Sequence, residues 1–197
     1  MKNYSIILLA AGLSKRMGVQ NKLLLPFRGT TLLEFCADRL LSLRAREIIV
    51  VTGHQAPQVQ FRLADRPFVF TFNRSYKKGM TSSIQQGVSV CDPKSAGALI
   101  CQGDMPNLEV QDLQLIEKTI LELMSKNKKG IVQPRIKKRL GNPVFFTRNY
   151  FNDILTHEEP NGCKSIIQKN KEYLVKIKLN NKNAFADIDT KSDYGQY

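Results

Sequence analysis

The sequence predicts an α/β protein, a three-layer, doubly wound fold in which a mainly parallel sheet carries helices on both faces. Three observations favour this class. Short apolar segments that end in small residues or glycine are typical of strands covered on both faces. They alternate with segments whose apolar residues recur every three or four positions, as in amphipathic helices. The chain has 197 residues, of which 42% are hydrophobic and 24% are charged, which favours a single folded domain over 1–197.

The first part of the chain alternates strands and helices at short intervals. Each expected strand is an apolar run, and these strands lie at 6–10, 47–52, 68–72 and 96–101. Thr30 or Thr31 can cap the first helix, whose apolar positions recur from 32 to 43. The other helices are expected near 59–63, from about 81 through 88, and at 108–124. Ligands bind where the strands of such sheets end, so we expect a site at 11–12, 52–53 and 103–104.

After about residue 125 the pattern changes. Two basic stretches, 126–130 and 135–139, are expected to be turns. A strand is expected at 141–146, a short helix at 162–169, and a strand at 173–179 whose lysines alternate with apolar residues. The sequence contains neither an internal repeat nor a long linker, so we expect these elements to belong to the same domain.

The residue inventory excludes several kinds of site. Only two histidines exist, His54 and His157, which excludes a multi-His metal centre, and the four cysteines form no C-x-x-C pair. We expect four reduced thiols in a cytoplasmic protein. The apolar segment 6–13 resembles a secretory signal, but no small-residue cleavage site follows it and it is too short to cross a bilayer. We therefore expect a buried strand there and no association with membranes.

The most informative segment is the loop after the first strand, 9–18, together with 21–26. Small residues after a strand let the backbone approach a ligand closely, and Gly12 can adopt a positive φ. Successive backbone amides in such a loop form an anion-binding concavity, to which hydroxyls and cations add further ligands for phosphate oxygens. The G-x-G-x-x-G pattern and the ATPase-type loop ending in Gly-Lys-Ser/Thr are both absent from the sequence. We expect this loop to bind phosphate through Ala11, Gly12, Ser14, Arg16 and Lys22.

Two acidic segments predict a metal site. Asp104 follows a glycine at the end of the strand 96–101, so its carboxylate is expected to project into the crevice at that edge. The alternation at 187–189 puts two carboxylates on one face of an extended segment. Mg²⁺ binds one or two carboxylates together with phosphate oxygens and water. We expect Asp104 and either Asp187 or Asp189 to bind Mg²⁺, and the spacing does not favour one member of the pair.

Taken in order, the motifs of this chain resemble those of the molybdenum cofactor cytidylyltransferases, which are nucleotidyltransferases related to the molybdenum cofactor guanylyltransferases. The most specific motif is L-A-A-G-L-S-K-R-M-G at 9–18, followed by N-K-L-L-L-P at 21–26. The further motifs are N-R-S-Y at 73–76, G-M-T-S-S at 79–83, G-D-M-P at 103–106, G-N-P at 141–143 and D-I-D-T at 187–190. The resemblance implies a single-domain fold like that of the nucleotide-diphospho-sugar transferases. It also implies nucleotidyl transfer, in which an acceptor phosphate attacks the α-phosphorus of a nucleoside triphosphate and pyrophosphate leaves.

The resemblance implies roles for the residues of the phosphate and metal motifs. Arg16, Lys22 and Asp104 are implied as the catalytic residues. Loop amides at 11–14, with Arg16, would hold the β- and γ-phosphates, while Lys22 neutralises the α-phosphate. Mg²⁺ on Asp104, beside Gly103, would bridge phosphate oxygens. This chemistry needs neither a histidine nor a covalent nucleophile, because a phosphate oxygen is already ionised at pH 7.

The nucleotide base is expected in a pocket formed by several of the motifs. In the relatives, the residues around the base correspond to Ala10, Thr52, Asn73, Gly79 and Ser83. Ser83 is the best candidate for a direct bond to a cytosine edge; the alternative is a hydroxyl near a helix N-terminus that satisfies backbone amides. The L-A-A-G start and G-D-M-P resemble the cytidine-using branch, since guanylyl relatives usually carry L-A-G-G. We therefore expect CTP as the substrate, with guanylyl or other nucleotidyl transfer as the alternative.

The acceptor part departs from the family pattern. At 141–143 this chain has G-N-P where relatives typically have G-H-P, and at 159–164 it has E-P-N-G-C-K where they have a G-D-x-G-A-R run. The nucleotide-binding part is expected at about 1–125 and the acceptor-binding part at about 126–197. The resemblance implies a molybdopterin-type acceptor, and a different phosphorylated compound is the alternative. A non-catalytic carrier of a phosphorylated cofactor is an alternative class of function.

The chain is strongly basic. It has 30 Lys and Arg against 17 Asp and Glu, a net charge of +13. The basic runs have no interleaved aromatic residues, and the sequence contains no helix-turn-helix, zinc-finger or RNA-binding motif. We therefore expect solvated surface and steering of anionic substrates rather than a nucleic-acid partner. The resemblance implies a cofactor chaperone or a target dehydrogenase as a protein partner.

Overall fold

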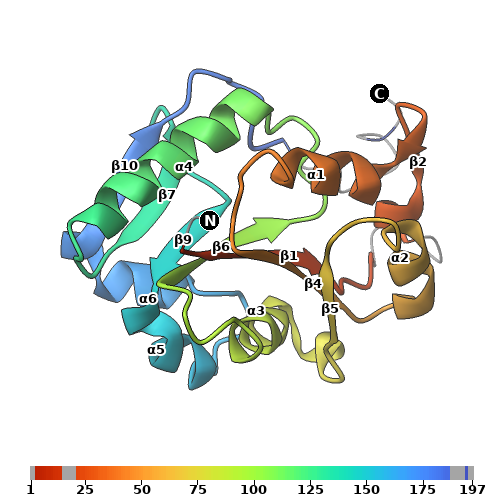
Figure 1. Ribbon diagram of the computed structural model, residues 1–197, viewed down its shortest axis with the longest axis horizontal. Helices are drawn as coiled ribbons and strands as arrows, with labels where there is room; N and C mark the ends of the chain where they lie inside the picture. Colours follow the sequence, from red (N-terminus) through yellow and green to blue (C-terminus); the bar gives the residue numbers. More distant parts are fainter. Residues whose placement is uncertain (1–2, 15–20, 187–193, 195–197) are drawn as a thin grey trace.

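The fold is a central sheet between two layers of helices (Figure 1), and the computed structural model describes it over residues 3–14, 21–186 and 194. The strands of the sheet follow the order β10-β7-β9-β6-β1-β4-β5, and β8 pairs with β7. Their bounds are Ser5–Ala10 for β1, Glu47–Thr52 for β4, Val69–Phe72 for β5, Gly97–Gln102 for β6, Ile131–Ile136 for β7, Arg139–Leu140 for β8, Val144–Thr147 for β9 and Leu174–Lys178 for β10. A separate antiparallel pair consists of β2 (Pro26–Phe27) and β3 (Thr30–Thr31).

Neighbouring strands are parallel in the part of the sheet around β1. This strand pairs in parallel with β4 and with β6, and β5 pairs in parallel with β4. By contrast, β9 is antiparallel to both β6 and β7, while β10 runs parallel to β7. The sheet is therefore mainly parallel, as expected, and the carboxyl ends of β1, β4 and β6 meet at one edge.

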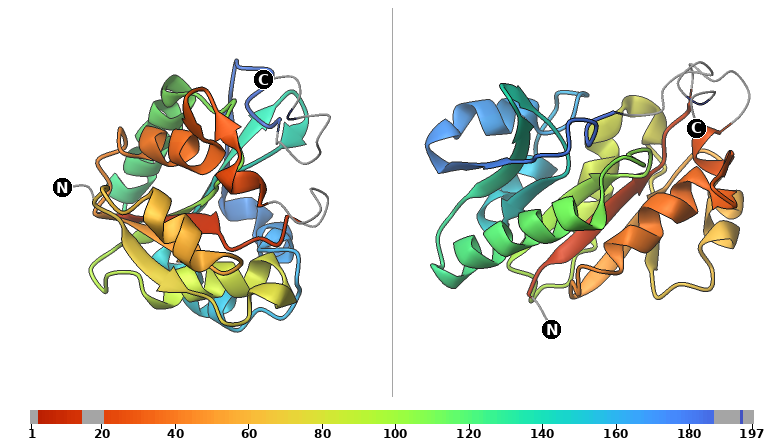
Figure 2. Two further views of the ribbon diagram at one scale, coloured as in Figure 1. Left: turned by 90° about the vertical axis from the view of Figure 1, so that its right-hand side faces the viewer. Right: turned by 90° about the horizontal axis from the view of Figure 1, so that it is seen from above.

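Both faces of the sheet are buried, because alternate residues of each strand point to opposite faces. In β1, Ile6 and Leu8 belong to one hydrophobic core and Ile7 belongs to the other. Residues of α1, α2 and α4 complete the first core, and residues of α3, α5 and α6 complete the second. The helix bounds are Leu32–Leu40 for α1, Ala56–Arg62 for α2, Met80–Ser89 for α3, Val110–Ser125 for α4, Phe151–Leu155 for α5 and Lys164–Lys169 for α6. Figure 2 shows α1 and α4 side by side on their face of the sheet.

Short 3₁₀ helices connect several of these elements. They are η2 (Lys22–Leu24), η3 (Tyr76–Lys78), η4 (Arg148–Tyr150) and η5 (Lys171–Tyr173). Within the described ranges, no helix is both long enough and apolar enough to cross a membrane.

Local hydrogen bonds determine where α1 begins. Thr31 Oγ1 accepts the backbone N–H of Glu34 at 3.3 Å, and the Glu34 carboxylate accepts the N–H of Thr31 at 3.0 Å. This capping box satisfies amides that the first helical turn leaves open. Of the two threonines that the sequence offered as a cap, Thr31 is the one used.

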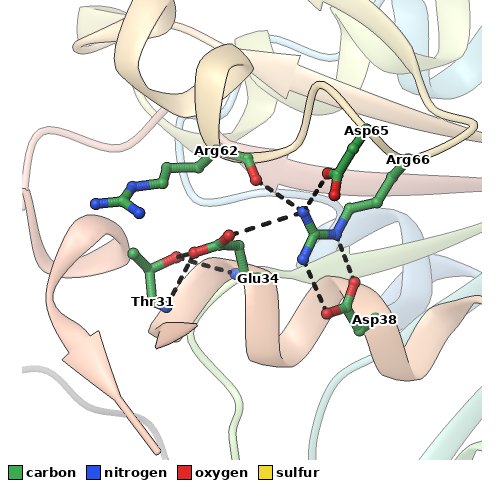
Figure 3. Close-up of polar contacts among 6 residues, drawn as sticks. All are labelled: Thr31, Glu34, Asp38, Arg62, Asp65 and Arg66. Atoms are coloured by element: carbon green, nitrogen blue, oxygen red, sulfur yellow. Dashed lines mark hydrogen bonds and ion pairs between the residues drawn. The ribbon is translucent and has the colours of Figure 1, made fainter. Parts of the chain in front are cut away.

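An ionic cluster around Arg66 joins the end of α2 to α1 (Figure 3). Arg66 Nε and Nη2 donate to the two carboxylate oxygens of Asp38 at 2.6 and 3.0 Å. Its Nη1 donates to Asp65 at 2.7 Å and to the carbonyl of Arg62 at 2.8 Å, and it lies 3.7 Å from a carboxylate oxygen of Glu34. Every nitrogen of the guanidinium group thus has an acceptor. We call this group of residues the Arg66 cluster.

The part of the chain after α4 differs most from the expectation. The basic turn expected over 135–139 is present but shorter, because β7 and β8 form a hairpin there and only the residues between them turn, with Lys137 at φ 53°. Gln133 and Pro134 interrupt the apolar pattern of β7, so no strand was expected at this position. The strand expected at 141–146 begins only at Val144, and α5 was not expected.

Candidate active site

A cavity of about 430 Å³ opens at the sheet edge where β1 and β6 end. Parallel strands place their carboxyl ends at one edge, and in doubly wound sheets ligands bind at that edge. We call this the first cavity. The members of the predicted site that line it are Ala11, Gly12, Ser14, Lys22, Gly79, Ser83 and Asp104.

Lys22 and Asp104 form an ion pair on the wall of the first cavity. Lys22 Nζ lies 2.5 Å from Asp104 Oδ2, and the two side chains are 15% and 16% exposed. Lys22 begins η2, whereas Asp104 follows β6, so the pair joins segments that are distant in the sequence. The other carboxylate oxygen, Asp104 Oδ1, is buried and accepts no hydrogen bond from the described part of the chain. Because a buried oxygen without a partner is unfavourable, a cation or a donor supplied by a ligand would stabilise this site.

The donor set of the first cavity fits a hard divalent cation. Asp104 offers one carboxylate, whose Oδ1 has no hydrogen-bond donor among the described residues. Mg²⁺ needs only one or two carboxylates when phosphate oxygens and water complete its shell. Among the described residues, no group of three or more His, Cys, Asp or Glu could hold a metal ion by protein ligands alone. The other expected ligands, Asp187 and Asp189, lie outside the described residues.

Hydrogen bonds around Asn21 shape the loop that carries Lys22. Ser14 Oγ accepts the N–H of Lys22 at 3.1 Å and donates to Asn21 Oδ1 at 3.4 Å. Asn21 Oδ1 also accepts the N–H of Leu23 at 3.1 Å, which caps η2. Gly12 does not use the positive φ that is open to glycine, and the left-handed position among the described residues of this loop is Ser14, with φ 49°. A Cβ at Gly12 would meet nothing within 4 Å, so this glycine leaves space in the cavity rather than turning the chain.

The start of α3 forms another part of the cavity wall. Asn73 Nδ2 donates to both Ser82 Oγ and Ser83 Oγ at 3.0 Å. Asn73 is buried and does not itself line the cavity, but it orients Ser83, which does. Gly79, just before α3, has φ 114°, and a Cβ there would lie 2.8 Å from the carbonyl oxygen of Pro160. A side chain at Gly79 would therefore be both strained and in collision with the backbone.

Thr81 ties the start of α3 to the segment that precedes α6. Its hydroxyl donates to the carbonyl of Glu159 and accepts the N–H of Gly162, the latter at 2.9 Å. Gln85, one helical turn later, donates its Nε2 to carbonyls at the end of α5 at 3.1 Å. The wall of the first cavity and the chain after α5 are therefore held together through α3.

Three further residues of the predicted site are buried beside the cavity and do not line it. Ala10 and Thr52 end β1 and β4, and the hydroxyl of Thr52 donates to a carbonyl of β5 at 3.1 Å. Gly103 donates its N–H to the carbonyl of Leu9 at 3.2 Å. These contacts shape the strand ends from which the loops of the cavity depart. Arg16, the remaining predicted residue, lies outside the described residues.

Several residues that line the first cavity were not predicted from the sequence, namely Tyr76, Lys77, Met80 and Gln102. Tyr76 can approach because β4 is followed by Gly53, where a Cβ would lie 2.7 Å from that of Tyr76. A signal for all these positions existed, since each lies in or next to a motif that we used only for its other residues.

A second cavity of about 350 Å³ adjoins the first, because Leu9, Met80 and Gln102 line both. Its remaining lining comes mainly from the chain after α4, including β7, β9 and α6. Asn142 Nδ2 donates to Gln102 Oε1 at 2.9 Å, between the two cavities. Cys163 lines the second cavity as well, and burial raises the pKa of its thiol to about 12, so the thiol is uncharged at neutral pH.

Known proteins are similar to this chain over most of its length. Residues 6–174 match the model of the MobA-like NTP transferase domain. Nicotine blue oxidoreductase of Paenarthrobacter nicotinovorans is 28% identical over 187 residues, which cover 93% of this chain and 91% of that protein. Molybdenum cofactor cytidylyltransferase of Escherichia coli is 25% identical over 195 residues, which cover 98% and 95%. A probable molybdenum cofactor guanylyltransferase of Methanosarcina acetivorans is 34% identical over 125 residues, which cover 59% and 53%.

Solved structures share the fold. Rv0371c of Mycobacterium tuberculosis has a TM-score of 0.84 at 22% identity, with 99% of this chain and 97% of that chain covered. A structure of Rv0371c in complex with manganese has a TM-score of 0.81 at 20% identity, with 99% and 97% covered. These neighbours agree with the fold that the family resemblance implied. Because the family model matches well over half of the chain, this protein belongs to the MobA-like NTP transferase family and is a nucleotidyltransferase.

Proposed function

We propose that this protein transfers CMP from CTP to the phosphate of a molybdopterin-type acceptor and releases pyrophosphate, with Mg²⁺ as its metal. The family and the similarity to the Escherichia coli cytidylyltransferase over 98% of the chain support the reaction. The observation that carries the proposal is the ion pair of Lys22 and Asp104 on the wall of the first cavity. It brings a cation for phosphate and a carboxylate for metal to the same point of the sheet edge.

The triphosphate is proposed to lie along the loop after β1. Backbone N–H groups at 11–14 donate to oxygens of the β- and γ-phosphates, as in other anion-binding loops. Lys22 Nζ exchanges Asp104 Oδ2 for an oxygen of the α-phosphate, so its charge is available where negative charge develops during transfer. Arg16 is proposed as a further phosphate ligand from the same loop.

Asp104 is the proposed protein ligand of the metal. Once Lys22 pairs with phosphate, both carboxylate oxygens of Asp104 are open to a cation. Mg²⁺ held there by Asp104 would supply positive charge to neutralise phosphate oxygens. Asp187 or Asp189 is proposed as the second carboxylate ligand.

The acceptor requires no side chain as a general base. Its phosphate is ionised at pH 7, because the second pKa of a phosphate monoester is about 6. One of its oxygens forms a new bond to the α-phosphorus of CTP, the bond from that phosphorus to the bridging β-phosphate oxygen breaks, and pyrophosphate leaves. The residues of this chain therefore contribute the positioning of two phosphates and the stabilisation of charge.

Ser83 is proposed to contact the base of the nucleotide. Ser83 lines the first cavity, and its hydroxyl oxygen accepts a hydrogen bond from Asn73 Nδ2, so the hydroxyl proton can be donated to the carbonyl of a cytosine edge. Ala10, Thr52 and Gly79 are proposed to shape the base pocket. Gly79 lines the cavity, whereas Ala10 and Thr52 are buried beside it.

The deciding experiment measures pyrophosphate release from ATP, CTP, GTP and UTP, each with Mg²⁺ and molybdopterin. We expect release with CTP and molybdopterin together, and none when either is left out. Lys22→Met is the matched control and should show little release, because methionine keeps most of the side-chain length and removes the charge. Activity with GTP, or with a different phosphorylated acceptor, would keep the reaction class and reject the proposed substrate. No release with any nucleotide would reject the proposal and favour a carrier protein.

An oxidoreductase is the second candidate, because the relative of that name is similar over 93% of this chain. The absence of a G-x-G-x-x-G pattern from the sequence disfavours dinucleotide binding of the usual kind. Oxidation of NADH or NADPH in the presence of a quinone dye, followed by absorbance, tests this candidate. Turnover in that assay without pyrophosphate release would favour the oxidoreductase.

A further inference from the structure

The two edges of the sheet are built differently (Figure 1). Among the described strands, β5 and β10 each have a neighbour on one side only, β4 and β7 respectively. The outer backbone groups of an edge strand are open to another strand, and proteins commonly protect such an edge with lysine. Leu179 donates its N–H to the carbonyl of Arg135, so the alternation along the strand turns the backbone of Lys176 and Lys178 away from β7. Both lysines are exposed, and β10 is therefore a protected edge.

The backbone of β5 is open in the same way, but its outward positions carry phenylalanine. Asn73 donates its N–H to the carbonyl of Thr52 at 2.9 Å, which turns the backbone of the odd-numbered residues of β5 toward β4. The N–H and C=O groups of Phe68, Phe70 and Phe72 consequently face away from the sheet. A strand added there would find donors and acceptors already aligned.

The side chains of β5 also lack the usual protection of an edge. The segment 67–73, P-F-V-F-T-F-N, contains no charged residue. Val69 and Phe72 are 46% and 47% exposed, although both are large and apolar. An uncharged edge with exposed apolar side chains favours pairing with another chain.

An antiparallel copy of β5 is complementary to β5 itself. Phe68 and Phe70 pack against the first hydrophobic core, and Phe72 shares their face because side chains alternate along a strand. When the two copies are related by a twofold axis at Phe70, each Phe68 lies opposite Phe72 of the other copy. The six rings then form a continuous row on one face, and aromatic pairs of this kind stabilise neighbouring strands.

Charges beside the two ends of β5 complement each other in the same register. Asp65, in the turn before β5, is 82% exposed and belongs to the Arg66 cluster, where three carboxylates surround one guanidinium group. Arg74 follows β5, is exposed, and forms no ion pair within the described part of the chain. Antiparallel pairing brings Arg74 of each copy toward the Arg66 cluster of the other, so opposite charges meet at both ends.

We propose that β5 pairs antiparallel with β5 of a second copy of this chain, and that the two sheets become one continuous sheet across a twofold axis at Phe70. The assembly ends at a dimer, because the outer edges are then the two β10 strands, where a further copy would bring lysine opposite lysine. The interface is independent of the proposed function, since neither cavity is lined by residues 65–74.

Disulfide trapping tests the second copy and its register together. In this register Val69 lies opposite Thr71 of the other copy at a non-hydrogen-bonded pair, where Cα atoms are about 4.5 Å apart and a disulfide can form. Two copies of Val69, or of Thr71, are diagonal neighbours about 7–8 Å apart, which is too far. With oxidised glutathione, an equal mixture of Val69→Cys and Thr71→Cys should therefore yield a covalent dimer. Neither variant alone should, and the wild type should not, because its four cysteines are buried.

Sedimentation equilibrium measures the strength of the interface. We expect a dimer whose dissociation constant rises at least about tenfold in Phe72→Lys, because a charge replaces a ring that pairing buries. Leu115→Lys is the matched control and should stay within about twofold of the wild type. Leu115 is 40% exposed and lies on α4, and its replacement adds the same charge away from β5.

Three results would overturn the inference. The first is a wild-type monomer at every concentration up to roughly 1 mM, which would leave the edge to another partner or to no partner. The second is disulfide formation in the single variants as fast as in their mixture, which would reject the register. The third is equal dimerisation of Phe72→Lys and the wild type. The trapping experiment does not use Phe72→Lys and still decides the question if that variant does not fold.

Discussion

The Arg66 cluster and the pair of Lys22 and Asp104 each hold a cation of the same exposure, but they differ in how far their hydrogen bonds are satisfied. The side chains of Arg66 and Lys22 are each 15% exposed. Around Arg66 every guanidinium nitrogen has an acceptor, whereas Asp104 keeps one buried oxygen without a donor from the described residues. A saturated cluster can only stabilise the fold, while an unsaturated pair in a cavity can exchange partners with a ligand. Hydrogen-bond saturation distinguishes these two groups of charges, and the proposed function depends on the unsaturated one.

The largest effect is expected from breaking the unsaturated pair. Lys22→Met should lower the kcat of nucleotidyl transfer by about 10²–10³-fold, because it removes charge stabilisation that acts in the transition state. Its free energy of unfolding should change by less than about 1 kcal/mol, because solvent reaches the pair and one carboxylate oxygen is already without a donor. Asp104→Asn should behave in the same way. Pyrophosphate release and urea unfolding of the same samples measure both quantities, and a loss of activity that merely follows unfolding would contradict the distinction.

A smaller effect of the opposite kind is expected from the saturated cluster. Arg66→Met should lower the free energy of unfolding by about 1–2 kcal/mol, because it leaves Asp38 and its neighbours without their shared donor. The kcat should remain within about twofold of the wild type, since surface charges that are remote from the reacting atoms add little. Arg62→Met is the control, because Arg62 contributes only its carbonyl to the cluster and its side chain points away in Figure 3. Equal destabilisation by Arg66→Met and Arg62→Met would show that the contacts of the Arg66 guanidinium group do not stabilise the fold.

The smallest effect concerns the pH dependence of the same cluster. Burial raises the pKa of the Glu34 carboxyl, but the hydrogen bonds that it accepts from Thr31 outweigh burial and hold the pKa below its usual value. A carboxyl of this kind contributes stability above its unfolded pKa of about 4.3, and that stability is lost as the pH falls further. Glu34→Gln should therefore reduce the difference in unfolding free energy between pH 7 and pH 3 by roughly a few tenths of a kcal/mol. Urea unfolding at the two pH values measures it, and an unchanged difference would count against this role of Glu34.

The first part of the fold was predictable because its strands are mainly apolar runs that two layers of helices bury. The strands and helices up to α4 therefore lie close to their expected positions. After α4 the signal weakens, since Gln133 and Pro134 interrupt β7 and the five residues of α5 are too few to show a helical period. The hairpin of β7 and β8 was not predicted for a similar reason, because its lysines and arginines are typical of a turn.

The candidate site divides in a similar way. Lys22 and Asp104 were predictable because a cation and a carboxylate at strand ends have an evident use in phosphate chemistry. Gln133 and Gln102 were not, because neutral amides carry no motif. Their chemical character depends on which amide atom already has a partner, and only the three-dimensional arrangement shows that. The left-handed backbone of Ser14 was likewise not predictable, because glycine adopts a positive φ more readily than serine and Gly12 lies in the same loop.

The three residues that line both cavities, Leu9, Met80 and Gln102, limit how the protein can diversify. Under the proposed function, a substitution in this common partition would alter the fit of nucleotide and acceptor at once, so selection for a new acceptor would damage the existing nucleotide preference. Independent change would then be open at residues that line one cavity alone, for example Ser83 in the first and Gln133 in the second. Directed evolution toward a new acceptor should therefore randomise the outer side of the second cavity and leave the partition intact.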